Sequence, residues 1–260
     1  MKRFFILLSM VVALSACQKD GDWTDPTQGE EAGLFKLTKT ELDGMSFSLG
    51  EISDPGTITT PYPFFSVLSW DQWRRLAGEE RAAAIEVPED ILKEMTTLAL
   101  VKTVVNYPSL TDYAYAYNYP LAAMNALIER SALFQELVSR ENAEDILIWA
   151  YGRATVDPMY LTDPDTAWAN WKPEVPFELE RMGLVNYEAF LILLATDSFD
   201  FSNSPYLDYF KAVTAARIGE KKLDLSGKTT YYFDPLLVIW DKYFGNLAPN
   251  ICAGAYPYEF

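Results

Sequence analysis

The chain has 260 residues, half of them apolar, and its 37 acidic and 21 basic side chains give a formal net charge of −16. Such a charge opposes binding to nucleic acid and close contact with anionic lipid headgroups. Histidine is absent, which excludes Ser-His and Cys-His nucleophile pairs and imidazole metal sites. The sequence has no Gly-rich phosphate loop and no complete Ca²⁺ loop, so it predicts neither a cofactor nor a metal.

The first residues have the pattern of a targeting segment. Lys2 and Arg3 precede an apolar run, Phe4 to Leu14, that is shorter than the roughly 20 residues needed to span a bilayer. The run ends in Leu14-Ser15-Ala16-Cys17, which resembles the lipobox of bacterial lipoproteins. We therefore expect a signal peptide over residues 1–16 and acylation of Cys17, which would attach the protein to a membrane. The alternative is an ordinary secretory signal that contains a cysteine.

An acidic, polar stretch follows over residues 17–33, and its composition is typical of a flexible tether. Its start, Gln18-Lys19-Asp20 with Gly21-Asp22, resembles the short export signal that sends some Gram-negative lipoproteins to the outer face of the cell. The resemblance implies an outer-membrane lipoprotein exposed on the cell surface. A plain solvated linker on a periplasm-facing lipoprotein is the alternative.

The sequence predicts an irregular segment or a small hairpin over residues 34–68. Met45, Phe47 and Leu49 alternate with serines, and Asp43-Gly44 is a dipeptide typical of hairpin turns. A two-residue turn there would, however, place Thr40 opposite Phe47, so the apolar faces of the two strands disagree.

The sequence predicts a helical domain over residues 69–260. Ser69 and Gln72 have the spacing of a capping box, and Pro88 opens an apolar stripe of helical period that includes Leu98 and ends before Asn106-Tyr107-Pro108. A second stripe includes Leu137. The short predicted connections indicate an all-α fold, an array of short helices packed antiparallel.

Further helices are predicted beyond Tyr151. One covers Phe177 to Ala195, and Ser204-Pro205 and Asp234-Pro235 each have the pattern of an N-cap followed by proline at the first helical position.

Two segments of the domain resemble a family of secreted bacterial proteins to which no activity is assigned. The first is Leu92-Lys93-Glu94-Met95-Thr96-Thr97 with Leu100-Val101 and Asn106-Tyr107-Pro108, and the second is Gln135-Glu136-Leu137-Val138 with Arg140. The match covers about a third of the chain, and its motifs are structural in character. It implies a helical fold and an exported protein.

Aromatic side chains are the candidate ligand-binding residues. Tyr113 and Tyr117 would share a helical face, as would Trp168 and Trp171, and such rings can stack on sugars or hold a peptide. The competing interpretation is that these rings only bridge core and solvent.

The sequence therefore favours a surface-anchored, non-catalytic binding or envelope-associated protein whose partner is a glycan, a peptide or an envelope protein. The alternative is a membrane-anchored hydrolase that uses a pair of carboxylates, although no spacing selects a pair or any other catalytic residue.

Overall fold

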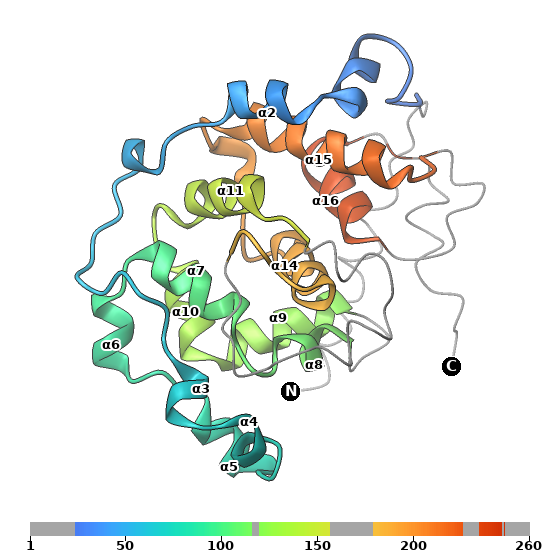
Figure 1. The fold of residues 1–260 in the computed structure, drawn as a ribbon. Helices are drawn as coiled ribbons and strands as arrows, with labels where there is room; N and C mark the ends of the chain where they lie inside the picture. Colours follow the sequence, from blue (N-terminus) through green and yellow to red (C-terminus); the bar gives the residue numbers. More distant parts are fainter. Residues whose placement is uncertain (1–23, 116–119, 157–178, 226–233, 246, 248–260) are drawn as a thin grey trace, which may run out of the picture. The chain divides into compact units, whose positions relative to one another are not determined.

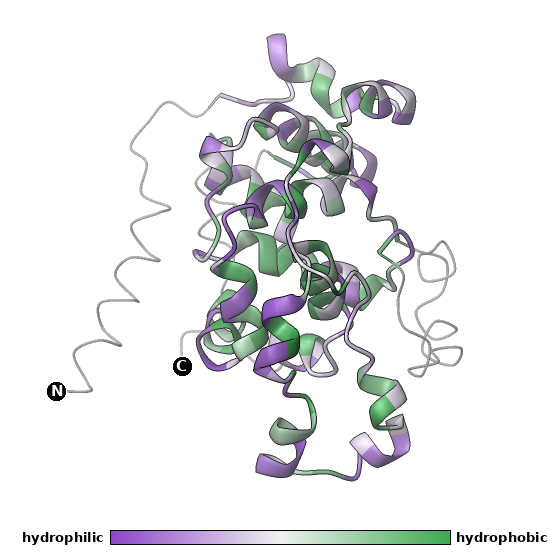
Figure 2. Ribbon diagram, turned by 90° about the vertical axis from the view of Figure 1, so that its left-hand side faces the viewer, coloured by the Kyte–Doolittle hydropathy of each residue, from purple (hydrophilic) through white to green (hydrophobic). Residues whose placement is uncertain are grey.

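The computed structural model describes residues 24–115, 120–156, 179–225, 234–245 and 247, and these residues form helices without a sheet. The described residues contain only two isolated bridges between extended segments, Ile58 with Met95 and Val156 with Met182. The predicted all-α class is therefore confirmed (Figure 1). Most of the helices carry both hydrophilic and hydrophobic residues (Figure 2), as helices with one buried and one solvated face do.

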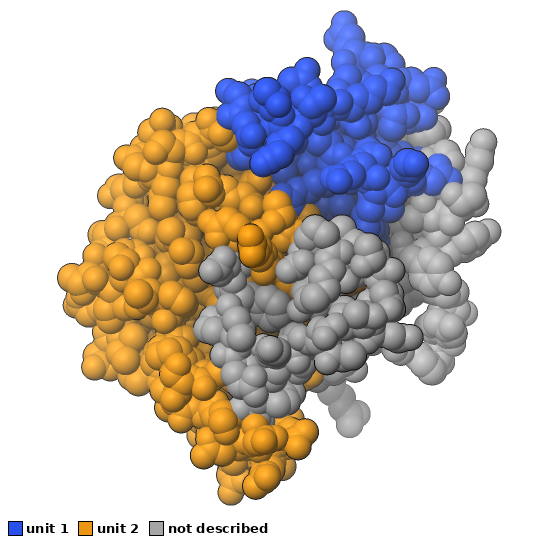
Figure 3. Space-filling view, viewed as in Figure 1, with its two compact units in different colours: residues 1–45, 207–260 blue, residues 46–206 orange. Residues whose placement is uncertain are grey.

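The chain divides into two compact units (Figure 3). Unit 1 consists of residues 1–45 and 207–260, and unit 2 of residues 46–206. The described helices of unit 1 are η1 (Glu30–Lys36), α2 (Lys39–Met45), α15 (Leu207–Lys221) and α16 (Pro235–Tyr243). α15 contacts the other three. The buried core of unit 1 includes Phe210, Val213, Ile239 and Trp240.

Unit 2 begins with small helical turns and continues with longer helices. Its described helices are η2 (Leu49–Glu51), α3 (Phe64–Val67), α4 (Trp70–Trp73), α5 (Gly78–Ala84), α6 (Glu89–Glu94), α7 (Thr97–Val105), α8 (Leu110–Tyr115), α9 (Pro120–Arg130), α10 (Ala132–Val138), α11 (Ala143–Arg153), α14 (Leu184–Ala195) and η3 (Phe201–Asn203).

The core of unit 2 lies where sequential helices meet. α7 packs against α10 and α11, α10 contacts α6 and α9, and α14 packs against α8 and α9. Met95, Leu100, Leu137 and Ile146 are fully buried there. α14 is buried on nearly all sides, as its run Leu191-Ile192-Leu193-Leu194 requires.

Several predicted helix boundaries are confirmed. The Ser69 hydroxyl and the Gln72 side chain form the reciprocal hydrogen bonds of a capping box at the start of α4. Asp234 caps α16 by accepting the Leu236 N–H at 2.9 Å, with Pro235 at the first helical position. α7 ends at Val105, directly before Asn106-Tyr107-Pro108.

The predicted hairpin in residues 34–52 is wrong. Asp43-Gly44 lies inside α2, and no strand precedes or follows it among the described residues. The Phe47 ring is instead stacked on that of Tyr206, with 3.5 Å between ring centroids. The ring that packs against Phe47 therefore comes from a distant part of the sequence, not from a neighbouring strand.

Three other boundaries differ from the sequence pattern. The helix predicted from Phe177 begins only at Leu184, because Gly183 takes an extended N-cap conformation. Gly78 is of the residue type that commonly follows the end of a helix, but it begins α5, with φ of +53°. The Ser204 hydroxyl accepts the Tyr206 N–H in the turn before α15, so Pro205 is not the first residue of that helix.

The long helix predicted from Pro88 is interrupted at Met95, which separates α6 from α7. Residues 53–62 run alongside this interruption and are called the strap here. The Ile58 N–H donates to the Glu94 carbonyl at 2.9 Å, and the Thr96 N–H donates to the Ile58 carbonyl at 2.9 Å. Backbone groups that a continuous helix would have used are thus satisfied by the strap.

Candidate functional site

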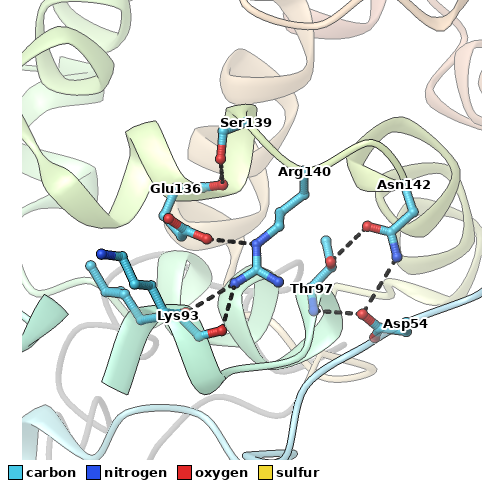
Figure 4. A network of polar contacts seen from close by, with 8 residues as sticks. Asp54, Lys93, Thr97, Glu136, Ser139, Arg140 and Asn142 are labelled. Carbon is cyan, nitrogen blue, oxygen red and sulfur yellow. Dashed lines mark hydrogen bonds and ion pairs between the residues drawn. The ribbon is translucent and has the colours of Figure 1, made fainter. Parts of the chain in front are cut away.

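A network of polar contacts lies at the junction of the strap with α7, α10 and α11 (Figure 4). Its members include Thr97 at the start of α7 and Glu136 and Arg140 at the end of α10. The side chains of this network point toward one another from four separate parts of unit 2.

Asp54 is the centre of one half of the network. Its Oδ1 accepts the backbone N–H of Thr97 at 2.6 Å, and its Oδ2 accepts that of Leu98 at 3.1 Å. These are two of the first N–H groups of α7, which have no partner within the helix. The carboxylate also lies at the positive end of the helix dipole. Asp54 therefore caps α7 from outside the helix.

Asn142 connects this cap to α11. Its Oδ1 accepts the Thr97 hydroxyl at 2.7 Å, while its Nδ2 donates to the Ser53 carbonyl and, at 3.5 Å, to Asp54 Oδ1. One amide thus uses its donor and acceptor ends to hold α7 and the strap together.

Gly56 explains why the strap can approach so closely. Its φ is +138°, a backbone conformation that favours glycine. A Cβ atom there would lie 2.7 Å from the Thr96 nitrogen. Any side chain at this position would push the strap away from the start of α7.

Arg140 is the centre of the other half of the network. Its Nε donates to Glu136 Oε1 at 2.7 Å, and its Nη2 donates to the Leu92 carbonyl at 3.0 Å. The Leu92 carbonyl lies near the C-terminal end of α6, where a cation is favourable. The Arg140 and Glu136 side chains are only 15% and 24% exposed, so this ion pair is better shielded from water than those on the surface.

The network is chemically suited to holding segments in place. The Asp54 oxygens accept N–H groups of the protein itself, and the Glu136 carboxylate is paired with Arg140. Both acids thus hold parts of the fold in position. Among the residues that the structure describes, no group of three or more metal-ligating side chains could hold an ion.

An apolar hollow lies beside α3, α4 and α5. Phe64, Phe65, Leu68, Trp73, Ala84, Ile85 and Pro108 line it. Its empty space is about 160 Å³, part of it open to solvent, whereas pockets for small molecules usually measure about 300–1,000 Å³. The hollow is therefore too small for a drug-sized ligand.

Of the candidate aromatic residues, Tyr113 is described, and it lies half-buried on α8. Tyr117, Trp168 and Trp171 lie outside the described residues, as do Cys17, Gln18, Lys19 and Asp20. The structure therefore places only one residue of the predicted site.

Sequence reasoning missed the Asp54–Thr97–Asn142 network. Asp54 precedes Pro55-Gly56, a pattern typical of a loop, and nothing in that pattern indicates contact with a helix 43 residues later. Asn142, the other side chain that contacts Thr97, likewise lies 45 residues beyond it in the sequence.

No described helix is long and apolar enough to cross a membrane. Comparison with known proteins gives no further guidance, because no protein-family model, no curated protein and no solved structure matches the chain.

Proposed function

We propose that this chain is an outer-membrane lipoprotein, anchored by acyl chains on Cys17 and exposed on the cell surface, that binds a partner without changing it chemically. The observation that carries the proposal is the ordered series of a basic start, a short apolar run and Leu14-Ser15-Ala16-Cys17. Each buried methylene of an acyl chain contributes about 0.8 kcal/mol, and two or more chains make attachment stable.

The proposed exposure on the cell surface rests on Gln18-Lys19-Asp20, and it can be tested separately from the lipid anchor. Replacing Lys19 and Asp20 by alanine should leave the protein in the membrane fraction but protect it from protease added to intact cells. The matched control is the double substitution Lys39→Ala and Asp43→Ala, which likewise removes one lysine and one aspartate, both well exposed on α2 and outside the signal. Equal digestion of the wild type and both double variants would contradict the proposed export signal.

Binding is favoured over hydrolysis because three of the described acids have structural partners. Asp54, Asp200 and Asp234 each accept backbone N–H groups at the start of a helix. Their oxygens therefore stabilise helix ends, as capping residues do. This use supports a structural role for these carboxylates.

The predicted partner is a glycan, a peptide or an envelope protein, recognised through aromatic side chains. The Tyr113 ring is half-buried on α8, so part of its surface is open to contact. Large aromatic residues are enriched among the side chains that contribute most to binding. Tyr113 is the described member of a set that also includes Tyr117, Trp168 and Trp171.

The test is capture by the purified protein from an immobilised panel of glycans and peptides. Separate alanine substitutions of the four aromatic residues should weaken capture several-fold while thermal unfolding stays close to that of the wild type. Tyr113→Phe is the matched control, because it keeps the ring. Turnover of a captured glycan or peptide that disappears on replacing a single acid would instead establish the hydrolase alternative.

A further inference from the structure

The N-terminal part of unit 1 is fixed to α15 well before the end of the expected tether. The Phe35 side chain is buried, and its ring lies 5.1 Å from that of Trp240. The Glu31 carboxylate pairs with the Lys211 ammonium group. η1 is therefore part of the folded unit, although residues up to 33 have the composition of a linker.

A glycine allows this close packing. A Cβ atom on Gly219 of α15 would lie 1.9 Å from the Phe35 carbonyl oxygen. The backbone of η1 thus lies directly against that of α15, and a larger residue at position 219 would separate them.

Ordered structure continues toward the N-terminus from η1. Asp25 Oδ1 accepts the N–H and the hydroxyl of Thr27, and Asp25 Oδ2 accepts the Gln28 amide at 3.0 Å. These bonds hold the pKa of the Asp25 carboxyl below its usual value. Thr24, which directly precedes this hydrogen-bonded turn, lies only seven residues after Cys17.

Covalent geometry then limits how far this part of unit 1 can lie from the anchor. Seven residues span at most about 25 Å when fully extended. The 15 residues of α15 rise over roughly 22 Å. The greatest reach of the connection is therefore about the length of that one helix.

The distribution of charge is compatible with a position near headgroups. The described residues of unit 1 include ten acidic and seven basic side chains, a net charge of −3, whereas those of unit 2 include nineteen and nine, a net charge of −10. Exposed Lys36 and Lys222 lie close in sequence to the Phe35–Gly219 contact, as do the acids Glu220 and Asp224. Lys221 is also exposed there, but it is paired with Asp234. The charge that opposes anionic lipid thus belongs mainly to unit 2.

We propose that unit 1 lies at the membrane, with η1 and the adjoining surface of α15 close to the lipid headgroups. The occupant of this surface is the bilayer that holds the acyl chains of Cys17, so the inference rests on the proposed lipid anchor.

The test is energy transfer from a fluorophore on unit 1 to a labelled lipid. The intact lipoprotein carries Cys252→Ser and Lys36→Cys, is labelled at position 36, and is reconstituted into phosphatidylethanolamine–phosphatidylglycerol vesicles that contain a rhodamine lipid. Two variants carry inserts of about twenty residues between Asp22 and Trp23. A proline-rich insert extends roughly 60 Å, whereas a Gly/Ser insert of the same length spans about 22–27 Å.

Transfer should be strongest without an insert, weaker with the Gly/Ser insert and several-fold weaker with the proline-rich insert. Equal transfer from all three proteins, or negligible transfer without an insert, would overturn the inference. A label on Lys39→Cys provides a second position if the first substitution disturbs η1. Failure of the intact protein to float with vesicles would instead contradict the lipid anchor, so the two failures are distinguishable.

Discussion

The Asp54 carboxylate accepts the backbone N–H of Thr97, so a residue of the strap caps a helix that begins 43 residues later. The strap and α7 therefore depend on each other. Without the strap, α6 and α7 would lack the partners that satisfy their backbone groups at the Met95 interruption.

Removing this cap should destabilise unit 2. We expect Asp54→Ala to lower the free energy of unfolding by about 1–3 kcal/mol, because it leaves N–H groups at a buried helix start without an acceptor. Chemical denaturation monitored by circular dichroism measures the change. Asp71→Ala is the control, since Asp71 is exposed and pairs with Arg74 at the surface; its expected cost is below about 1 kcal/mol. Equal costs for the two variants would contradict the capping role.

Truncation of the Leu137 side chain should destabilise the core of unit 2. This side chain is fully buried on α10, and Leu137→Ala should cost about 2–5 kcal/mol by creating a cavity. Leu98 lies on the predicted apolar stripe but is only half-buried, so Leu98→Ala should cost less. Thermal unfolding of both variants tests this order, and a larger loss for Leu98→Ala would contradict it.

The difference in burial between Leu98 and Leu137 illustrates what a sequence pattern can predict and what it cannot. Helical period correctly indicated that the apolar stripes that include Leu98 and Leu137 lie on helices. It could not indicate the interruption at Met95, because the cause is a backbone contact with Ile58. Likewise, the alternation around Phe47 indicated a strand, since the sequence does not show that Tyr206 supplies the stacking partner. Local signals such as the capping box and Asp234-Pro235 were sufficient because both partners are close in sequence.

Alkaline pH should destabilise unit 2 through Tyr107. This phenol is buried and packs edge-on against Phe64 and Phe134, and burial raises its pKa above the ordinary value near 10. Stability from this group is fully present below the unfolded pKa of about 10 and decreases as the pH rises above it, because the unfolded chain then loses the proton more readily. Tyr107→Phe should therefore lose less stability between about pH 9 and 11 than the wild type. Denaturation at several pH values measures this; identical slopes for wild type and Tyr107→Phe would refute the assignment.

The packing of η1 on α15 should be sensitive to one added methyl group. In Gly219→Ala the new Cβ would meet the Phe35 carbonyl, so we expect η1 to become separated from α15 and the melting temperature of unit 1 to fall. Gly33→Ala is the matched control in η1, because no atom lies within 4 Å of a Cβ there. Hydrogen exchange of residues 30–36 should accelerate only in Gly219→Ala; unchanged exchange would show that the contact is dispensable.

The candidate site was less accessible to sequence reasoning than the fold. Aromatic spacing selected Tyr113, Tyr117, Trp168 and Trp171, but spacing reports which residues share a helical face and not which face meets solvent. Asp54 carries no such pattern. Its role follows from the position of the strap, which only tertiary structure determines.

The most direct test of the account concerns Cys17. Cells that express the wild-type chain or Cys17→Ala are labelled with a radioactive fatty acid, and the protein is then recovered from membrane and soluble fractions. Cys252→Ala is the matched control, because it removes the other cysteine. The account predicts acyl label and membrane retention for the wild type and Cys252→Ala, and loss of both for Cys17→Ala. Unchanged label and membrane partition in Cys17→Ala would contradict the lipoprotein assignment.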